Sequence, residues 1–271
     1  MVPVARTYLF VPGDRPERFD RALASGADAV ILDLEDSVAP AAKSRARTAI
    51  AQRLLAATQE EHRRLIVRIN DESTPDFDAD LTLLDAINIA CVMLPKAERP
   101  ATVARLRKVC LGIEVLALIE TARGVLQAEA LAETSGVVRL VFGTIDYALD
   151  LNLSGDSPGF DYAACRLTIA SRAAGLPAPV AGVTPEIADP GPLLSDLQRA
   201  RANGFSAKLC IHPKQIDTVH AALQPSTAEL DWARRVIGAA QMGIGAVQVD
   251  GRMVDKPVLH WAKALIARAE R

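Results

Sequence analysis

The sequence predicts an α/β protein, a (β/α)8 TIM barrel with a C-terminal helical extension. Short apolar runs of strand-favouring residues recur along the chain, and stretches with helical spacing separate them. Half of the 271 residues are hydrophobic but only 4% are aromatic, so aliphatic side chains must form the core. Alternating strands and helices are typical of parallel βαβ units, whose strands are buried on both faces.

Eight runs have the composition of buried strands, in regular order along the chain. They span residues 7–11, 29–32, 65–69, 90–94, 114–119, 138–142, 179–183 and 207–211. The helical stretches between them include residues 41–57, 77–87, 102–110, 125–134, 162–174 and 193–203. Eight strand–helix units are the number that closes a (β/α)8 barrel. We therefore expect residues 1–224 to form a barrel domain.

An open, doubly wound sheet is the main alternative architecture. Such a sheet usually carries a glycine-rich phosphate-binding turn after its first strand. Here the first strand is followed by Pro12-Gly13-Asp14, and neither GxGxxG nor GxxxxGK[ST] occurs anywhere. The absence of these motifs favours the closed barrel.

Residues 225–271 fall outside the eight repeats. Ser226 or Thr227 can cap a helix, and Asp250-Gly251 is a turn signal between two short strands. The expected elements are a helix to about residue 242, strands at 246–249 and 253–254, and a last helix from Pro257. We therefore expect these residues to form a separate C-terminal arm.

Charge and cysteine usage exclude several classes of protein. Lys plus Arg number 31 and Asp plus Glu 33, a net charge of −2, so no basic field exists to attract nucleic acid. Uncharged runs such as 236–249 are shorter than the ~18 residues that cross a membrane, and the strand-like N-terminus does not resemble a secretory signal. The four cysteines form no CxxC motif, as expected of a cytoplasmic protein with reduced thiols.

Polar residues follow most of the predicted strands, where the active sites of barrels lie. They are Asp33, Glu35 and Asp36 after the second strand, Arg68 and Asn70 at the third, Lys96 after the fourth, Glu120 after the fifth, Asp146 after the sixth and His212 after the eighth. Packing alone does not explain so many polar groups beside buried strands. We expect several of them to share one site.

Glu120 and Asp146 form a pair suited to a hard divalent cation, because magnesium is often held by one or two carboxylates together with substrate oxygens and water. The alternative is that either one is a buried ion-pair partner of Arg68 or Arg123. Arg68 itself could clamp a substrate carboxylate, polarise a carbonyl, or simply pair with an acid.

Lys96 permits a different mechanism. A lysine at a strand end can form a Schiff base with a carbonyl substrate, as in a lysine-dependent aldolase. We favour the simpler interpretation, an ion pair with Glu98 or with a carboxylate of the site. Near the expected mouth, Arg15, Arg18 and Phe19 are candidate substrate contacts.

Eight motifs in order give the chain a family resemblance. They are FVPGDRPERF (10–19), ILDLEDSV (31–38), LIVRIN (65–70), MLPKAE (93–98), ALIETARG (117–124), FGTIDYALDL (142–151), CIHPKQI (210–216) and DGRMVDKPVL (250–259). Together they resemble the HpcH/HpaI aldolase and citrate lyase family, in its citrate lyase β-subunit-like branch. The similarity runs from about residue 6 to about residue 260.

The resemblance implies a fold, a reaction and a set of residues. It implies a barrel with a C-terminal extension, assembled as a homotrimer or a dimer of trimers, that uses Mg²⁺ to cleave or form a carbon–carbon bond in an acyl-CoA thioester. Glu120 and Asp146 match the metal ligands, and Arg68 matches the substrate-binding arginine. Asp255 matches a catalytic residue that a neighbouring subunit contributes, so the arm at 225–271 is expected to pack on that neighbour.

The expected function is Mg²⁺-dependent cleavage or condensation of a thioester such as citryl-, malyl- or citramalyl-CoA, with acetyl-CoA and an oxo acid as the products of cleavage. A Schiff-base aldolase using Lys96, or a subunit of a citrate lyase complex that works on an acyl-carrier thioester, is the alternative. One motif departs from the family pattern. Relatives often read G-x-E-D-L around the second ligand, but Ile145 here precedes Asp146, so substrate preference is less safely inherited than metal binding.

Overall fold

The computed structural model describes residues 5–87, 89–155, 158–242 and 247–269. The chain divides into two compact units, one ending at His220 and the other beginning at Ala221. This division falls inside α11 (Ile216–Leu223), a few residues before the boundary expected at Pro225. None of the helices in the described ranges is long and apolar enough to cross a bilayer.

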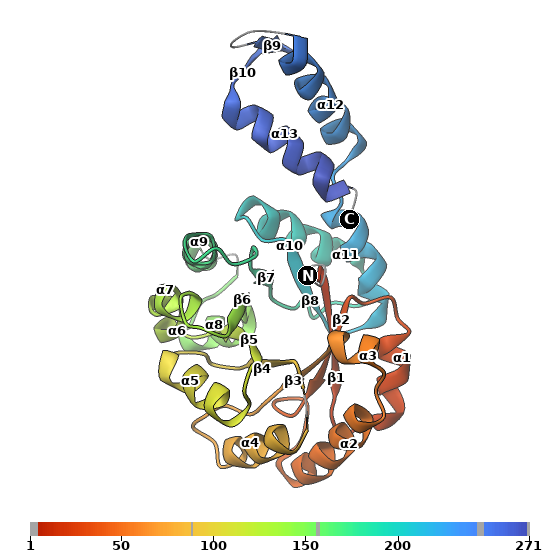
Figure 1. Cartoon of the computed structure of the whole chain (residues 1–271), viewed down its shortest axis with the longest axis vertical. Helices are drawn as coiled ribbons and strands as arrows, with labels where there is room; N and C mark the ends of the chain where they lie inside the picture. The colour runs from red at the N-terminus through yellow and green to blue at the C-terminus, as the bar shows by residue number, and fades with distance from the viewer. Residues whose placement is uncertain (1–4, 88, 156–157, 243–246, 270–271) are drawn as a thin grey trace. The chain divides into compact units, whose positions relative to one another are not determined.

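The first unit is a closed barrel of eight parallel strands, which confirms the predicted fold (Figure 1). Each strand pairs with the next in the chain, and β1 pairs with β8 to close the ring. The strands are β1 (Thr7–Pro12), β2 (Ala29–Asp33), β3 (Leu65–Arg68), β4 (Cys91–Leu94), β5 (Glu114–Ile119), β6 (Val137–Phe142), β7 (Val180–Ala181) and β8 (Ala207–Cys210).

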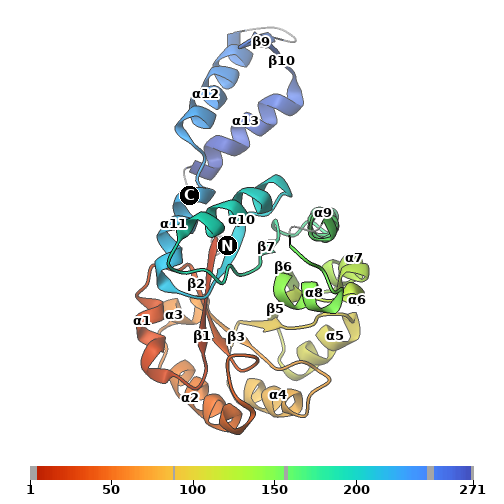
Figure 2. The ribbon, with the colours of Figure 1, turned by 180° about the vertical axis from the view of Figure 1, so that it is seen from behind.

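Helices surround this ring of strands (Figure 2). They are α1 (Phe19–Leu23), α2 (Lys43–Leu55), α3 (Gln59–Arg64), α4 (Asp76–Ala86), α5 (Pro100–Val109), α6 (Ala122–Leu126), α7 (Ala128–Ala132), α8 (Thr144–Asp150), α9 (Pro158–Ala173), α10 (Pro190–Ala202) and α11, with 3-10 turns η1 (Pro16–Arg18), η2 (Pro40–Ala42) and η3 (Pro213–Gln215). The predicted helix at 125–134 is two short helices that meet at Gln127, and the predicted strand at 179–183 is shorter, with β7 spanning two residues.

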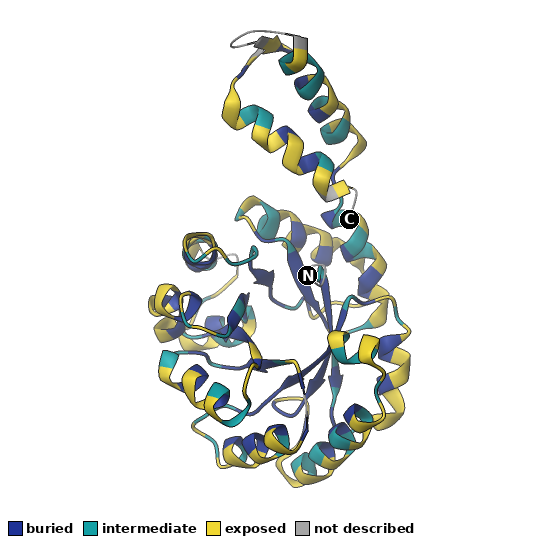
Figure 3. Ribbon diagram, viewed as in Figure 1, coloured by how far each residue is buried: buried dark blue, intermediate teal, exposed yellow. Residues whose placement is uncertain are grey.

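The barrel interior is filled by alternate residues of the strands, and the outer helix faces are exposed (Figure 3). The inward side chains include Tyr8, Ala29, Ile31, Ile66, Met93, Leu116, Leu118, Val141, Val180, Ala207 and Leu209. Successive side chains of a strand point to opposite faces. The next inward positions after Ile31, Ile66 and Leu118 are therefore Asp33, Arg68 and Glu120, at the carboxyl end of the barrel.

The second unit is a helical hairpin with a small antiparallel sheet. It comprises α12 (Thr227–Met242), β9 (Val247–Val249), β10 (Arg252–Val254) and α13 (Lys256–Ala269). Ser226 and Glu229 form a reciprocal capping box at the start of α12, as the sequence predicted for Ser226. The rings of Trp232 and Trp261 lie 4.6 Å apart and join the two helices. Residue 246 of the predicted strand lies outside the described residues.

Candidate active site at the carboxyl end of the barrel

Arg68 ends β3 and is the most heavily engaged residue of the candidate site. Its Nε and Nη2 donate to Asp33 Oδ1 and Oδ2, each at 2.7 Å, in a bidentate pair. Its Nη1 lies 2.7 Å from Glu35 Oε2, and its guanidinium carbon lies 4.7 Å from the centre of the Phe10 ring. Asp33 therefore holds the edge of the guanidinium that carries Nε and Nη2. Nη1 is the nitrogen that contacts a second carboxylate, that of Glu35.

Burial acts differently on the two carboxyl groups that contact Arg68. It would raise the pKa of Asp33, but the bidentate guanidinium holds that pKa below its ordinary value. Burial also raises the pKa of Glu35, to about 7, because Arg68 offsets it less and Asp33 and Asp36 lie close by. The contact of the buried Glu35 Oε2 with Arg68 Nη1 is an ion pair without hydrogen-bond geometry, so this oxygen accepts no hydrogen bond within the described part of the chain. Glu35 is one of the polar groups after the predicted strands that the sequence expects to share one site.

Glu120 follows β5 and is only 3% exposed. Its Oε1 accepts a hydrogen bond of 2.8 Å from the backbone N of Lys96. Burial, together with the nearby charges of Glu35 and Asp146, raises the pKa of the Glu120 carboxyl to about 8. The structure therefore brings together Glu120, Asp146 and Arg68 at one end of the barrel, as the strand ends predicted.

Asp146 lies in the first turn of α8 and is partly buried, next to the exposed Ile145. The turn into this helix passes close to Glu120. A Cβ atom added to Gly143 would lie 2.5 Å from Glu120 Oε2, so a side chain there would displace the carboxylate. The backbone N of Gly143 also donates to Ile119 O at 2.9 Å. This glycine is a site requirement that the motif contained but sequence reasoning did not recognise.

The residues of this end fit a hard divalent cation. The carboxyl groups of Asp33, Glu35, Asp36, Asp71, Glu120 and Asp146 outnumber the two nearby cations, Arg68 and Lys96, so negative charge is in excess. The raised pKa values of Glu35 and Glu120 express that excess. No group of three or more His, Cys, Asp or Glu side chains is arranged for a metal within the described ranges. Magnesium is often coordinated by one or two carboxylates, with water and substrate oxygens in the other positions. Glu120 and Asp146 fit that pattern.

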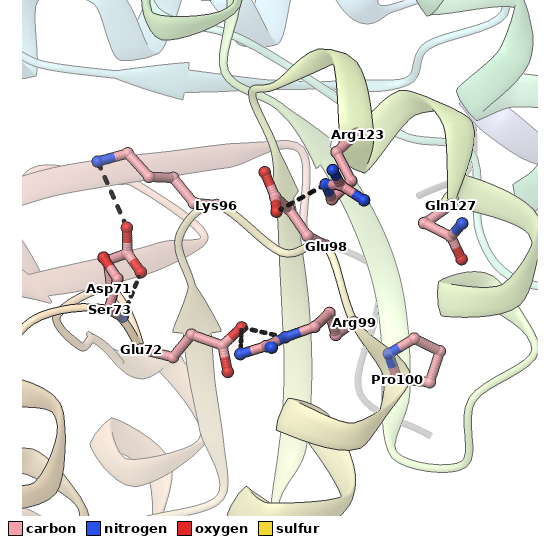
Figure 4. A pocket seen from close by; sticks show the side chains of 9 residues that line it. All are labelled: Asp71, Glu72, Ser73, Lys96, Glu98, Arg99, Pro100, Arg123 and Gln127. Atoms are coloured by element: carbon pink, nitrogen blue, oxygen red, sulfur yellow. Dashed lines mark hydrogen bonds and ion pairs between the residues drawn. The ribbon is translucent and has the colours of Figure 1, made fainter.

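Lys96 lies beside Glu120, at the edge of a charged cavity of about 590 Å³ (Figure 4). Its ammonium lies 3.6 Å from Asp71 Oδ2, and the cavity wall carries two further ion pairs, Arg99 with Glu72 and Arg123 with Glu98. Burial would lower the pKa of Lys96, but Glu35, Asp71 and Glu120 together raise it. A Schiff-base lysine must be neutral to attack, so the structure disfavours the aldolase alternative. Lys96 forms an ion pair, as expected, but with Asp71 and not with Glu98, which pairs with Arg123.

Two other predicted site residues have different surroundings. Arg15 precedes η1 and is exposed, with its Nε 3.9 Å from Asp14 Oδ1, so it remains available to a ligand. Phe19, in contrast, is 1% exposed and belongs to the packed face of α1. Its predicted role as a substrate contact is therefore wrong, because the aromatic ring fills the core between helix and barrel.

Asp255 lies in the second unit, immediately before α13, and is exposed. Its Oδ1 accepts a hydrogen bond of 3.1 Å from the backbone N of Val258, so its carboxylate caps the helix. The cap occupies one carboxylate oxygen and fixes the direction of the side chain. Oδ2 is the oxygen left to act on another group.

Comparisons with known proteins agree over nearly the whole chain. The model of the HpcH/HpaI aldolase/citrate lyase family matches residues 6–213, and a model described as C-C bond lyase of the TIM-barrel fold matches residues 163–271. A citrate lyase subunit beta-like protein of Mycobacterium tuberculosis is 40% identical over 271 residues, covering 97% of this chain and 94% of the relative.

Two further relatives connect the family to named ligands and reactions. A (3S)-malyl-CoA thioesterase of Cereibacter sphaeroides is 32% identical over 278 residues, covering 98% of this chain and 94% of the relative. The crystal structure of Mycobacterium tuberculosis CitE in complex with magnesium, acetoacetate and coenzyme A superimposes with a TM-score of 0.89 at 37% identity, covering both chains completely. On this evidence the chain belongs to the HpcH/HpaI aldolase/citrate lyase family, in its citrate lyase β-subunit-like branch.

Proposed function

We propose that this protein is a Mg²⁺-dependent carbon–carbon lyase that cleaves, or in reverse forms, a hydroxyacyl-CoA thioester of the citryl, malyl or citramalyl type. The observation that carries the proposal is the buried pair of Arg68 and Glu120 at the ends of β3 and β5, with Asp146 close by. The Mycobacterium tuberculosis structure bound to magnesium, acetoacetate and coenzyme A supports the same class of ligand.

Each residue of the site has a distinct proposed part. Glu120 and Asp146 would hold Mg²⁺, and the bound ion supplies Lewis-acid stabilisation of negative charge on the oxygens of the acid fragment. Arg68, oriented by Asp33, would bind that fragment's carboxylate through the Nη1 edge that now meets Glu35. Arg15 would contact the nucleotide end of coenzyme A from the loop after β1.

The reaction also needs a group that moves a proton at the thioester carbon, and we propose Asp255 of a neighbouring subunit for it. Its Oδ1 is used in capping α13, which would hold Oδ2 in a fixed direction. Two apolar side chains of the second unit, Met253 and Trp261, are 70% and 56% exposed. Exposed apolar groups of this kind support packing of residues 225–271 on another copy in a homotrimer or dimer of trimers.

A panel of thioesters tests the proposed function. The purified chain is assayed with citryl-, malyl- and citramalyl-CoA, and in reverse with acetyl-CoA and several 2-oxo acids, in Mg²⁺ and in EDTA. We expect Mg²⁺-dependent release of acetyl-CoA and an oxo acid from at least one ester. Release of free coenzyme A alone would indicate a thioesterase, and turnover of carrier-protein thioesters alone would indicate a citrate lyase subunit. Either result would overturn the proposal.

Mixed oligomers test whether Asp255 acts on a neighbour's barrel. Asp255→Ala and Arg68→Ala should each lose on the order of 10²-fold or more in kcat as pure oligomers. Co-expressed in equal amounts, the two variants should recover about one quarter of wild-type activity, since about one site in four combines an intact barrel with an intact neighbouring arm. The matched control pairs Arg68→Ala with Glu120→Gln, two defects of the same barrel, which should recover nothing. Equal recovery in both mixtures would contradict a shared site.

Magnesium binding should release a proton near neutral pH. A carboxyl group with a pKa of about 8 is mostly protonated at pH 7, whereas Mg²⁺ binds the ionised form of Glu120. We expect roughly one proton released per ion at pH 7, and an apparent affinity that rises with pH by up to about tenfold per unit until about pH 8. Calorimetric titrations in buffers with different ionisation enthalpies count the protons. Uptake of protons, or none, would be the opposite of this prediction.

A further inference from the structure

A second cavity lies on the outside of the barrel, beside β7. Its volume is about 440 Å³, and it is lined by residues from the ends of β6 and β7, from α8, α9 and α10, and from β8. Figures 1 and 2 show the short β7 between α9 and α10. Because β7 spans only two residues, the sheet offers little surface for these two helices to cover, and a space remains between them.

The walls of this cavity are largely apolar and aromatic. Phe142, Phe160 and Phe205 line it together with Ala164 and Ala181. The ring centres of Phe142 and Phe205 are 6.5 Å apart, and the ring planes are tilted by 43°. A volume of a few hundred Å³ with apolar walls and few polar groups is typical of a small-molecule site.

Lys208 supplies the unusual polar group of the cavity. Its neighbours on β8, Ala207 and Leu209, point into the barrel, so Lys208 points outward into the space between strand and helices. The side chain is only 3% exposed, and its ammonium lies 3.6 Å from Asp196 Oδ2, beyond normal hydrogen-bond distance. An ammonium has three donors, and burying them without acceptors is unfavourable.

Asp196, the ion-pair partner of Lys208, also interacts with a second residue. The Asp196 carboxylate accepts a hydrogen bond from Thr184 Oγ1, and its side chain is 49% exposed, so much of its charge remains in water. Burial accordingly lowers the pKa of Lys208 even though Asp196 acts in the opposite direction. Lys208 is therefore a desolvated cation whose neutralisation within the fold is incomplete.

The other charges that line the cavity are already engaged. Arg199 Nε and Nη2 donate to Asp161 Oδ1 and Oδ2 at 2.8 and 3.1 Å, a bidentate pair. Asn203 Nδ2 also donates to Asp161 Oδ1, at 3.0 Å. A bound anion would therefore find its free donors at Lys208 rather than at Arg199.

We propose that this cavity is a binding site for a small monocarboxylate with a compact aromatic or branched apolar body, whose carboxylate pairs with Lys208. The aromatic walls would cover the apolar body, and the anion would complete the hydrogen bonding of the buried ammonium. This site is distinct from the candidate active site, because Lys208 and Phe142 point away from the barrel interior while Arg68 and Glu120 point into it. It does not depend on the proposed function.

Phenylacetate and 3-methylbutanoate are suitable probes, with phenylacetamide as the uncharged match for the first. Binding is measured by calorimetry and by ligand-observed NMR, in EDTA so that no metal at the barrel end attracts the carboxylate. We expect phenylacetate to bind the wild type and the Arg68→Ala variant with equal affinity. Phenylacetamide should bind at least about tenfold more weakly, as expected from loss of a charge-assisted hydrogen bond.

Three variants locate the site. Lys208→Met, which keeps the volume and apolar stem of the side chain, should weaken phenylacetate binding at least about tenfold, whereas Lys214→Met, at an exposed lysine of η3, should leave it unchanged. Ala200→Phe, which fills the cavity from α10 and leaves Lys208 in place, should also abolish binding and serves if Lys208→Met does not fold. Binding that is lost in Arg68→Ala, kept in Lys208→Met and Ala200→Phe, equal for the amide, or absent up to millimolar concentrations in the wild type would overturn the proposal.

Discussion

Replacing Glu120 with glutamine is expected to lower Mg²⁺-dependent turnover by about 10³-fold or more, because one of two charged metal ligands is lost. The substitution changes little else. Glutamine has the shape of glutamate, and its amide oxygen can still accept the hydrogen bond from the Lys96 backbone. Asp146→Asn is expected to act in the same direction.

Thermal unfolding separates this effect from damage to the fold. Burial and neighbouring charges raise the pKa of Glu120 from 4.5 to about 8, so in metal-free protein this carboxyl group lowers stability progressively between these two pH values and fully above about pH 8. Glu120→Gln should therefore be at least as stable as the wild type in EDTA at pH 8, yet it should lose the rise in Tm that Mg²⁺ gives the wild type. Glu114→Gln is the matched control, because Glu114 is exposed at the start of the same strand.

If Glu120→Gln kept both the turnover and the Mg²⁺-induced rise in Tm, Glu120 would not be a metal ligand. A variant that lost turnover but kept the full rise in Tm would assign Glu120 to another catalytic step. A lower Tm in EDTA would show instead that the carboxylate supports the fold. The three outcomes therefore separate a role of Glu120 in metal binding from a role in another catalytic step and from a role in stability.

The site residues whose position follows from the register of a strand could be predicted from the sequence. Asp33, Arg68 and Glu120 each lie two positions beyond an inward apolar residue, so the period of the strand alone places them at one end of the barrel. Contacts between distant segments could not be predicted in this way. The bidentate pair of Arg68 with Asp33 joins residues 35 positions apart, and the requirement for Gly143 appears only when α8 passes Glu120.

Packing between helix and barrel explains the wrong prediction for Phe19. Phe19 lies in a charged segment whose composition suggests exposure, but its ring is on the buried face of α1. The strand predicted at 179–183 is present but shorter, because only Val180 pairs with β6, through Val141, and only Val180 and Ala181 pair with β8. The apolar run alone carries no information about where pairing stops, since that depends on the neighbouring strands.

Arg139 is the residue whose environment in the structure differs most from what the sequence suggests. In the sequence it is a single charge inside an apolar run, and strand alternation would allow it to face either solvent or core. In the structure it is 2% exposed and points into the barrel on the same side of β6 as Val141. Its position, near the start of β6, places it at the end of the barrel opposite Glu120.

The guanidinium of Arg139 ties together the segments that enter three other strands. Nε donates to Ala178 O at 2.7 Å, Nη1 to Ala5 O at 2.6 Å and to the Tyr8 hydroxyl at 3.0 Å, and Nη2 to Ser206 Oγ at 2.9 Å. These acceptors precede or belong to β7, β1 and β8. A single side chain therefore satisfies partly buried oxygens around the closing seam of the barrel.

Arg139→Met is expected to reduce the free energy of unfolding by about 3 kcal/mol, because it removes charged hydrogen bonds and leaves partly buried carbonyl oxygens without these donors. For a protein of this size that corresponds to a fall in Tm of about 6–12 °C. Differential scanning calorimetry in EDTA measures it. Arg63→Met, at an exposed position of α3, is the matched control and should shift Tm by about a degree or less.

Arg139→Lys distinguishes the charge from the geometry of the guanidinium. Lysine keeps a cation at the same depth but concentrates its donors on one atom, whereas the acceptors here lie in divergent directions around a planar fork. We therefore expect lysine to restore less than half of the stability lost in Arg139→Met. Near-complete rescue would mean that charge, rather than the bridging of three strand entries, is what the barrel requires. A methionine variant as stable as the wild type would show that apolar packing alone can close this end.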